Sequence, residues 1–403
     1  MKWDGFRSIE VRYYLYEVTR TIWFGVAVYI LLFQSAGLTY TSIHIIEVVY
    51  LITVFFAEIP TGYLGDRLGR RNTLVLGAVL LIMANLGYVV AKTPMGFAAV
   101  YVTFGLGHAL QSGTDSAWLF ETLQERNAQH LFTKVRGRAR GLGLIAAAFG
   151  AIVGGYLGEL SLLFPFLASA VVSSLGIPLL LSLPASEDRT VDGETGQPVS
   201  PKRALAVSRE ALFGPTLRPF VLYVVLIFGL FGVVQVWVQP IALSLGLVIK
   251  DIGWLYAGLI WVSGVLTYFS AELRGYLGLP RLLSLLPIIA GLLAVSVLVA
   301  PILAFPAFFV FRAVSRVLEP VEQQYLNEHI TTVGRATVLS SISMAKGVAA
   351  IPIELIGGVV ADLYSPIVAM GLVGIGLVTI SMTLWRFNKP VHDGHIDDMV
   401  GMD

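Results

Sequence analysis

Apolar runs long enough to cross a lipid bilayer recur along most of this chain. A membrane-spanning helix needs about 20 consecutive, mostly apolar residues. Such runs can be placed at 12–36, 42–64, 73–91, 97–120, 141–160, 162–183, 219–243, 250–271, 281–299, 301–326, 337–361 and 365–386. Hydrophobic residues make up 56% of the 403 positions and charged residues only 13%, whereas soluble domains are about one-quarter charged. The sequence therefore predicts an all-α membrane protein with twelve transmembrane helices.

The positions of lysine and arginine predict on which side of the membrane each loop lies, because cytoplasmic loops are enriched in both. With both termini in the cytoplasm, only Lys92 and Lys250 of the 27 basic residues fall in outer loops. Those within spans are Arg20, Arg312, Arg316 and Lys346. No small-residue cleavage site follows the basic residues near the N-terminus, so the first span is expected to be retained. We expect a multi-pass protein of the cell (plasma) membrane with both termini cytoplasmic.

One long polar segment divides the chain. Residues 184–218 are rich in Ser, Glu, Asp, Gly, Pro and Lys, a composition typical of a linker. The sequence therefore predicts an N-terminal six-helix half at 1–183, a cytoplasmic linker at 184–218 and a C-terminal six-helix half at 219–388. The polar tail at 389–403 is expected to be cytoplasmic.

Several classes of function are excluded or unsupported. The chain has no cysteine, which excludes disulfides and thiol chemistry, and its net charge of +1 gives no basic excess for binding nucleic acid. It contains no Gly-x-x-x-x-Gly-Lys-Ser/Thr loop for a nucleotide. No Ser/His/Asp set and no set of metal ligands stands out. We therefore predict no enzyme activity, no cofactor and no metal site.

The segment after the second span combines glycines with a charge cluster. Glu58-Ile59-Pro60-Thr61-Gly62 leads into Tyr63-Leu64-Gly65-Asp66-Arg67-Leu68-Gly69-Arg70-Arg71. This run resembles the loop between helices two and three of the major facilitator superfamily, Gly-x-Leu-x-Asp-Arg-x-Gly-Arg-Arg. The matching positions are Gly62, Leu64, Asp66, Arg67, Gly69, Arg70 and Arg71. The resemblance implies a gating motif and two six-helix halves around one substrate site, working by alternating access.

The fourth span supports the same assignment. Ser112-Gly113-Thr114-Asp115-Ser116-Ala117, followed by Trp118-Leu119-Phe120-Glu121-Thr122-Leu123, resembles a segment that recurs in a bacterial and archaeal branch of the superfamily. Other members often carry an arginine linked to proton transport on this span, but here only His108 is basic. Proton coupling through that arginine therefore does not carry over, whereas Asp115 lies deep enough to bind a proton or a cation.

Ionisable residues within spans normally face the helix bundle or a water-filled cavity. Glu17 and Arg20 are three residues apart and share a helix face. They are predicted either to neutralise each other or to let Arg20 meet an anionic group or a second carboxylate. Burial disfavours the charged form of a carboxyl, so Glu58 and Asp115 are candidate proton carriers. For Glu58, a fixed structural pairing with an arginine of the gate or with backbone donors is the favoured alternative.

Glycines follow a helical spacing in the fifth span. They stand at Gly141, Gly150, Gly154, Gly155 and Gly158. The spacing resembles the antiporter motif of the superfamily, except that Gly155 replaces its proline. Small residues allow helices to approach closely, so these glycines are expected to form a packing face. The same resemblance favours export over import.

The second half of the chain carries further polar residues within spans. Gln235 and Gln239 flank Trp237 in the seventh span and are predicted to bind either substrate or a neighbouring helix. Arg312 and Arg316 lie on one stripe of the tenth span, where Glu319 can neutralise Arg316. Lys346 lies near the middle of the eleventh span and shares a face with Glu354. These cations predict binding of an anion or pairing with buried acids.

These observations favour a secondary active transporter that exports a small organic compound in exchange for protons and acts as a monomer in the bilayer. A carrier or facilitator for an organic anion bound by Arg20, Arg312, Arg316 and Lys346 is the alternative within transport. A non-transporting membrane sensor or scaffold, or a lipid scramblase, is the alternative from another class.

Overall fold

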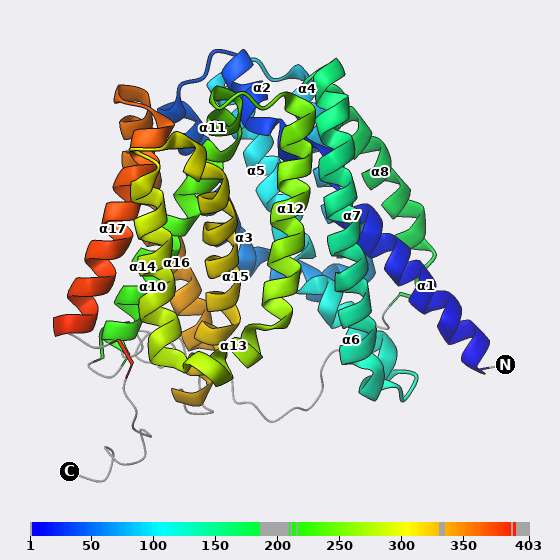
Figure 1. Ribbon diagram of the computed structural model, residues 1–403. Coiled ribbons are helices and arrows are strands. Elements are labelled where there is room, and N and C mark those ends of the chain that lie inside the picture. Colours follow the sequence, from blue (N-terminus) through cyan, green and yellow to red (C-terminus); the bar gives the residue numbers. More distant parts are fainter. Residues whose placement is uncertain are drawn as a thin grey trace, which may run out of the picture. The chain divides into compact units, whose positions relative to one another are not determined.

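The structure is a computed structural model that describes residues 2–185, 209, 212–214, 217–329, 335–387 and 390–391; the side chains of residues 2–7, 59, 66 and 335–337 lie outside this description. The elements before the linker are α1 (Lys2–Thr21), η1 (Phe24–Ala27), α2 (Tyr29–Ser35), α3 (Tyr40–Leu68), α4 (Arg70–Val90), α5 (Pro94–Gln111), α6 (Thr114–Gln124), η2 (Gln129–Leu131), α7 (Phe132–Leu160) and α8 (Phe164–Leu181). Those after it are α10 (Arg218–Val233), η3 (Val234–Trp237), α11 (Val238–Ser244), α12 (Ile249–Tyr268), α13 (Ser270–Leu277), α14 (Leu279–Ser296), η4 (Pro301–Leu303), α15 (Ala304–His329), α16 (Arg335–Leu363) and α17 (Pro366–Phe387). The predicted all-α class is confirmed, and no strand occurs among the described residues (Figure 1).

Ten helices of the described residues are long and apolar enough to cross a membrane, and the bent pair Ser8–Ala27 and Tyr29–Ser35 brings the number to eleven. The remaining predicted span, 97–120, is divided between α5 and α6. It breaks at Ser112 and Gly113, where Gly113 has φ +75°. A backbone at positive φ suits glycine because other L-residues are strained there. The twelve predicted spans therefore correspond to helices or to broken helices.

The chain divides into two compact units. Unit 1 comprises Met1–Asp192 and Ala242–Trp261, and unit 2 comprises Gly193–Ile241 and Val262–Asp403. The larger, N-terminal part of α12, up to Trp261, therefore belongs to unit 1, although it follows the linker in sequence. The predicted linker and tail lie almost wholly outside the described residues, so the boundary between two halves at 184–218 stays a prediction.

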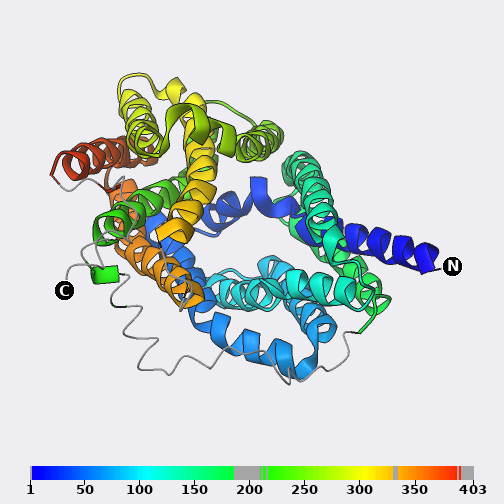
Figure 2. The ribbon, with the colours of Figure 1, turned by 90° about the horizontal axis from the view of Figure 1, so that it is seen from below.

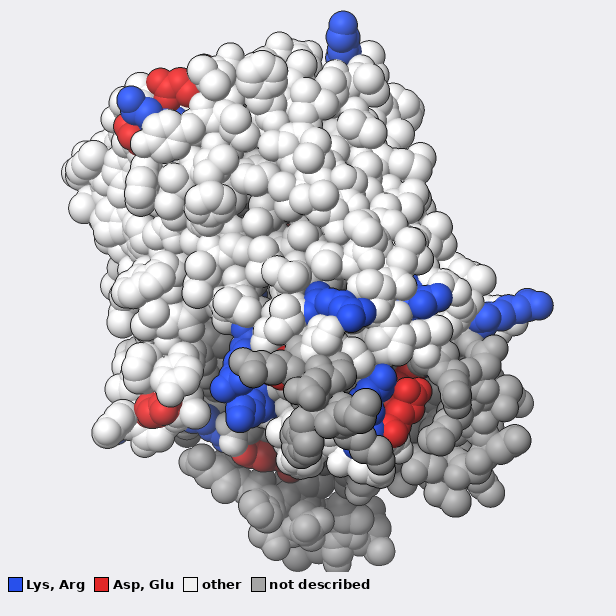
Figure 3. Space-filling view, turned by 90° about the vertical axis from the view of Figure 1, so that its right-hand side faces the viewer, with Lys and Arg blue, Asp and Glu red and all other residues white. Residues whose placement is uncertain are grey.

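In unit 1, α4 packs against α5 and α8, while α1 packs against α7 and α8. The inner part of this packing is a cluster of buried rings and aliphatic side chains. Tyr13, Tyr16 and Trp118 are almost fully buried there with Leu74 and Leu180. The side of unit 1 formed by α7 and α8 shows a broad uncharged band, with most of the visible Lys and Arg near one end and a few charged residues at the other (Figure 3). An uncharged outer band suits contact with lipid chains.

In unit 2, α14 lies beside α17, and α10 lies beside α16 (Figures 1 and 2). The contact between α14 and α17 depends on two glycines. A Cβ atom on Gly291 would lie 2.7 Å from the carbonyl oxygen of Gly374, and one on Gly374 would lie 2.5 Å from the carbonyl oxygen of Gly291. This spacing leaves no room for a side chain, so the glycines permit the backbones to touch.

Two tight turns have the same backbone conformation in the two units. Gly69, between α3 and α4, has φ 78° and ψ 146°. Gly278, between α13 and α14, has φ 74° and ψ 153°. The sequence around Gly278 has lost most of the charge pattern found around Gly69. The turn geometry is nevertheless the same, because each turn has a glycine, which adopts positive φ readily.

Candidate functional site

Arg20 joins two buried carboxylates in unit 1. Its Nη2 donates to Glu17 Oε1 and Oε2, both at 2.8 Å, and its Nε donates to Glu17 Oε2 at 3.1 Å. The same Nη2 donates to Asp115 Oδ2 at 3.2 Å. Glu17 and Asp115 are only 4% and 5% exposed. We call Glu17, Arg20 and Asp115 the Arg20 triad.

The local sequence explains how the triad forms. Glu17 and Arg20 are one turn apart on α1, so their side chains project from the same face. Asp115 lies in the first turn of α6, directly after the break at Gly113. Its other oxygen, Oδ1, accepts a hydrogen bond from the hydroxyl of Ser116 at 3.2 Å. Both alternatives predicted for Arg20, pairing with Glu17 and meeting a second carboxylate, are present at once.

The charges of the triad do not balance when all three groups are ionised, because two carboxylates face one guanidinium. An unbalanced charge buried in a protein is unfavourable. One bound proton would balance the triad. The surroundings are apolar: Tyr13 on α1 stacks on Trp118 of α6, with ring centroids 5.7 Å apart, and both rings are buried. The triad can therefore hold a proton in a water-poor site.

The predicted gating motif occupies the turn between α3 and α4. Gly69 forms the turn, Arg70 Nε donates to Glu121 Oε1 of α6 at 3.2 Å, and Arg71 Nη1 donates to the carbonyl oxygen of Leu183 at 3.1 Å. Gly62 lies in α3 with open space around it, and Arg67 is exposed. The side chain of Asp66 lies outside the described residues. Arg70 and Arg71 therefore tie this turn to the fourth and sixth predicted spans.

Glu58 and Asp115 differ in their surroundings, although both are predicted proton carriers. Glu58 lies on α3 and is exposed, whereas Asp115 is buried and paired with Arg20. The argument from burial applies to Asp115, and also to Glu17. It does not apply to Glu58 in this structure.

The glycines of α7 differ in how closely neighbouring atoms approach them. A Cβ atom on Gly154 would lie 1.9 Å from the carbonyl oxygen of Phe24, and one on Gly155 would lie 2.9 Å from Gly253 Cα of α12. On Gly158 it would lie 2.5 Å from Val28 Cγ1, and on Gly150 3.4 Å from Ile22 Cγ2. Gly141 has no neighbour within 4 Å. The close approach is thus concentrated in the C-terminal half of α7.

Unit 2 contains a polar pocket of about 240 Å³. It is lined by Phe228, Phe231, Gly232, Gln235, Arg312, Ser315, Arg316, Glu319 and Lys346. Three of these side chains are cationic and one is a carboxylate. Gln239, which was predicted beside Gln235, is fully buried instead. The structure thus brings together four of the residues predicted to bind substrate, namely Gln235, Arg312, Arg316 and Lys346.

Each cation of this pocket has a polar partner in unit 2. Lys346 Nζ donates to Glu322 Oε1 at 2.9 Å and lies 4.7 Å from the ring centroid of Phe228. Arg316 Nη1 donates to Glu319 Oε2 at 3.2 Å, and Arg312 Nε donates to the hydroxyl of Ser263 at 3.1 Å. Sequence reasoning missed Glu322, which is 2% exposed. The sequence feature that could have identified Glu322 is its position within the tenth predicted span, three residues after Glu319.

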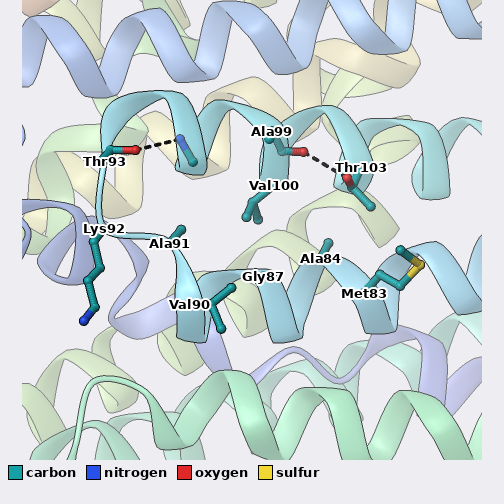
Figure 4. Close-up of a pocket in the computed structure, with 11 residues that line it drawn as sticks. Met83, Ala84, Gly87, Val90, Ala91, Lys92, Thr93, Ala99, Val100 and Thr103 are labelled. Atoms are coloured by element: carbon teal, nitrogen blue, oxygen red, sulfur yellow. Dashed lines mark hydrogen bonds between the residues drawn. The ribbon is translucent and has the colours of Figure 1, made fainter.

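A second pocket, of about 500 Å³, lies between α4 and α5 (Figure 4). Its lining is mostly small or apolar, with Lys92, Thr93 and Thr103 as the polar members. The Thr93 hydroxyl accepts from the backbone N–H of Gly96 at 3.1 Å, and the Thr103 hydroxyl donates to the carbonyl of Ala99 at 2.9 Å. Because both hydroxyls bond to their own helix, this pocket offers little polar recognition to a solute.

Comparison with known proteins gives matches along the chain. A sequence model described as Major Facilitator Superfamily matches residues 16–353. An uncharacterized MFS-type transporter of Methanocaldococcus jannaschii is 26% identical over 139 residues, which are 32% of this chain and 32% of the relative. The uncharacterized MFS-type transporter YqjV of Bacillus subtilis is 26% identical over 203 residues, 48% of this chain and 47% of the relative. The matched regions thus cover about a third of the first relative and about half of the second.

Solved structures match the fold over almost the whole chain. A mutant of the nucleoside transporter NupG has a TM-score of 0.81 at 13% identity, with 94% of this chain and 100% of that chain covered. A D-xylose-proton symporter has a TM-score of 0.72 at 15% identity, with 95% and 98% covered. The xylose transporter XylE from E. coli, in an inward-open conformation, has a TM-score of 0.67 at 14% identity, with 98% and 99% covered. At these identities the likeness shows the fold alone.

Proposed function

Because the chain belongs to the major facilitator superfamily, we propose that this multi-pass membrane transporter exports a small organic compound in exchange for protons. The observation that carries the proposal is the Arg20 triad, in which two buried carboxylates share one guanidinium. A site of this kind gains a favourable charge balance when it binds a proton. One structural neighbour is a D-xylose-proton symporter, so proton coupling is compatible with this fold.

Asp115 is the proton acceptor we assign within the triad. Arg20 makes three hydrogen bonds to Glu17 but one, of 3.2 Å, to Asp115. Protonating Asp115 therefore weakens fewer contacts than protonating Glu17. Tyr13 and Tyr16 of α1 and His108 of α5 also interact electrostatically with the triad. The two tyrosines are phenols, whose ordinary pKa lies far above neutral pH.

The proton would act on the contact between α1 and α6. When Asp115 is charged, its bond to Arg20 ties the two helices together. When Asp115 is neutral, that charge-assisted bond is replaced by a weaker one. In the alternating-access mechanism that we propose, loss of this tie frees one helix to move relative to the other. Export is favoured by the glycine pattern of α7, which resembles the antiporter motif.

The remaining elements of the proposal concern location and assembly. The basic residues of the loops support cytoplasmic positions for both termini by the positive-inside rule, and we assign the protein to the cell membrane as a monomer. A protease-accessibility assay on tagged N- and C-termini in oriented vesicles tests this arrangement. Cleavage of either terminus from the outer side would contradict it.

Transport in proteoliposomes tests the proposed coupling. An imposed pH gradient and an internal pH-sensitive dye would report proton movement while cationic, neutral and anionic solutes are added in turn. We expect one class of solute to move protons through the wild-type protein, and Asp115→Asn to abolish that movement. Asp251→Asn, at an exposed aspartate in the first turn of α12, is the matched control. Proton movement that survives Asp115→Asn would overturn the assignment of Asp115.

The pocket of unit 2 favours a second candidate, a carrier for an organic anion. Arg312, Arg316 and Lys346 line it, and an anion could exchange with the carboxylate of Glu319 or Glu322. Arg312→Gln should then abolish anion flux while flux of neutral or cationic solutes persists. Arg281→Gln, at an exposed arginine of α14, is the control. Unchanged anion flux in Arg312→Gln would exclude Arg312 as the anion site.

A further inference from the structure

A second polar site in unit 1 consists of a carboxylate surrounded by aromatic rings. It is formed where α3, α5 and the residue before η1 come together, and none of its members belongs to the Arg20 triad. We call it the Glu47 cluster; it comprises Trp23, Glu47, Tyr50, Tyr101, Phe104 and His108. The sequence pattern did not identify this site, because its aromatic residues look like ordinary apolar positions of spans.

Hydrogen bonds and ring contacts join α3 to α5 within the Glu47 cluster. The Tyr101 hydroxyl donates to Glu47 Oε1 at 3.0 Å. The Tyr50 ring meets the Tyr101 ring edge to face, with centroids 6.1 Å apart and an angle of 80° between the planes. The Tyr50 hydroxyl also lies 3.5 Å from His108 Nδ1. The carboxylate is thus placed next to two tyrosine rings.

Two further rings extend this aromatic surface. The Phe104 ring centroid lies 6.1 Å from that of Tyr50 and 4.6 Å from that of His108. It also lies 5.6 Å from the ring of Trp23, whose indole N–H donates to Asn85 Oδ1 at 3.2 Å. The hydrogen bond fixes the orientation of the indole. The rings therefore form a continuous wall that begins at Glu47.

Part of the Glu47 cluster is exposed at the surface of the protein. Glu47, Tyr50, Phe104 and Trp23 are half-buried, and His108 is exposed, although all belong to predicted membrane spans. Polar residues within spans usually face the bundle interior or a water-filled cavity. The cluster can therefore be reached by a solute, in contrast to the buried carboxylates of the Arg20 triad.

We propose that the Glu47 cluster binds the cationic group of an organic ammonium compound, with aromatic or alkyl substituents against the ring wall. A carboxylate supplies the opposite charge, and tyrosine, phenylalanine and tryptophan rings attract a cation over their faces. A few polar groups set among apolar rings are also typical of small-molecule sites. This inference rests on the proposed transport of a small organic compound and names its charge class.

The charged and titratable neighbours are compatible with a bound cation. The cluster itself contains no lysine or arginine. His44, one turn before Glu47 on α3, is fully buried, and Arg20, which interacts electrostatically with His108, is held by Glu17 and Asp115. Arg20 therefore already contacts two carboxylates within the triad.

Equilibrium binding to the full chain in detergent tests the proposal. Benzyltrimethylammonium is the cationic probe and phenylmethanesulfonate is an anionic probe of similar size, with affinities from isothermal titration calorimetry. We expect the cation to bind at least about tenfold more tightly than the anion, which corresponds to about 1.4 kcal/mol. Failure of the cation to bind, or tighter binding of the anion, would overturn the proposal.

Two pairs of variants identify the residues responsible. Glu47→Gln should weaken binding of the cation by about tenfold or more, while Glu159→Gln, at an exposed glutamate of α7, should leave it unchanged. Tyr50→Phe keeps the ring and should retain most of the affinity, whereas Tyr50→Leu should weaken binding about three- to thirtyfold, as expected for a lost cation–π contact. Equal effects of the two Tyr50 variants, or no effect of Glu47→Gln, would contradict the proposal.

This measurement is independent of proton coupling, because it uses no gradient and no transport. Loss of cation binding in Glu47→Gln supports the Glu47 cluster even when Asp115→Asn leaves proton movement intact. Absence of cation binding, together with proton movement that depends on Asp115, would instead reject the Glu47 cluster and leave the proposed coupling in place.

Discussion

The Nη2 atom of Arg20 lies 3.2 Å from Oδ2 of Asp115, although the two residues are 95 positions apart in the chain. The same nitrogen also contacts Glu17. One guanidinium thus connects α1 to α6 across two buried carboxylates. The energetic consequence is that these three residues act together, and a change at one of them alters the state of the others.

Replacement of Arg20 should destabilise the protein strongly. Arg20→Gln leaves Glu17 and Asp115 as buried carboxylates without their cation, and removing one partner of a buried pair costs about 3–5 kcal/mol. The double variant Arg20→Gln with Asp115→Asn should lose less stability than the two single effects combined, by about 0.5–3 kcal/mol. Thermal unfolding in detergent measures all three variants. Strictly additive effects would show that the contact is energetically unimportant.

The glycines of α7 should differ sharply in their tolerance of alanine. Gly154→Ala places a Cβ atom 1.9 Å from the carbonyl oxygen of Phe24, so α7 must move away from η1. Both the yield of folded protein and the transport activity should therefore decrease. Gly141→Ala meets open space and should preserve both, because alanine favours helix more than glycine does. Expression yield and thermal stability compare the two variants. A well-folded, fully active Gly154→Ala protein would rule out the close contact.

The turn at Gly69 should tolerate only glycine. Gly69→Ala forces an L-residue to φ 78° and ψ 146°, a region close to one that is essentially restricted to glycine, at a cost of about 1–3 kcal/mol. Gly69→Asn should lose a similar amount, because asparagine is enriched in the left-handed helical region at much smaller ψ and not in this one. Gly62→Ala, at a helical glycine with open space around it, is the control. A higher thermal midpoint for Gly62→Ala than for either Gly69 variant is the expected result.

The pairing of Lys346 with Glu322 should dominate the stability of the unit 2 pocket. Lys346→Met leaves the carboxylate of Glu322, which is 2% exposed, without its 2.9 Å contact, and should cost about 3–5 kcal/mol. Adding Glu322→Gln should restore part of that loss, because the buried charge is removed. Adding Glu354→Gln to Lys346→Met should not restore the lost stability. Rescue by the Glu354 change rather than the Glu322 change would contradict the observed pairing.

Hydrophobic periodicity and charge placement predict much of the fold correctly. A bilayer requires about 20 apolar residues per helix, so the spans can be located without knowledge of their neighbours. The loop from Gly62 to Arg71 and the segment after Ser112 indicate the family, which the match over residues 16–353 shows. Local spacing also predicts the contact between Glu17 and Arg20, because residues three apart on a helix share a face.

Contacts between helices could be identified only from the tertiary structure. Lys346 shares a helix face with Glu354, yet it forms an ion pair with Glu322 of α15. Glu58 is exposed, whereas a carboxyl within an apolar run suggested burial. The aromatic residues around Glu47 gave no local signal, because tyrosine and phenylalanine also occur as plain packing residues of spans.

The amino-acid sequence alone determined that this chain crosses the membrane many times, where its helices lie and which side chains share a face of one helix. Only the tertiary structure decided which faces meet: Asp115 with Arg20, Glu322 with Lys346, and Glu47 with Tyr101. The physical reason is that helical spacing sets the direction of each side chain around its own axis. The rotation and the neighbours of that axis depend on how all the helices pack together.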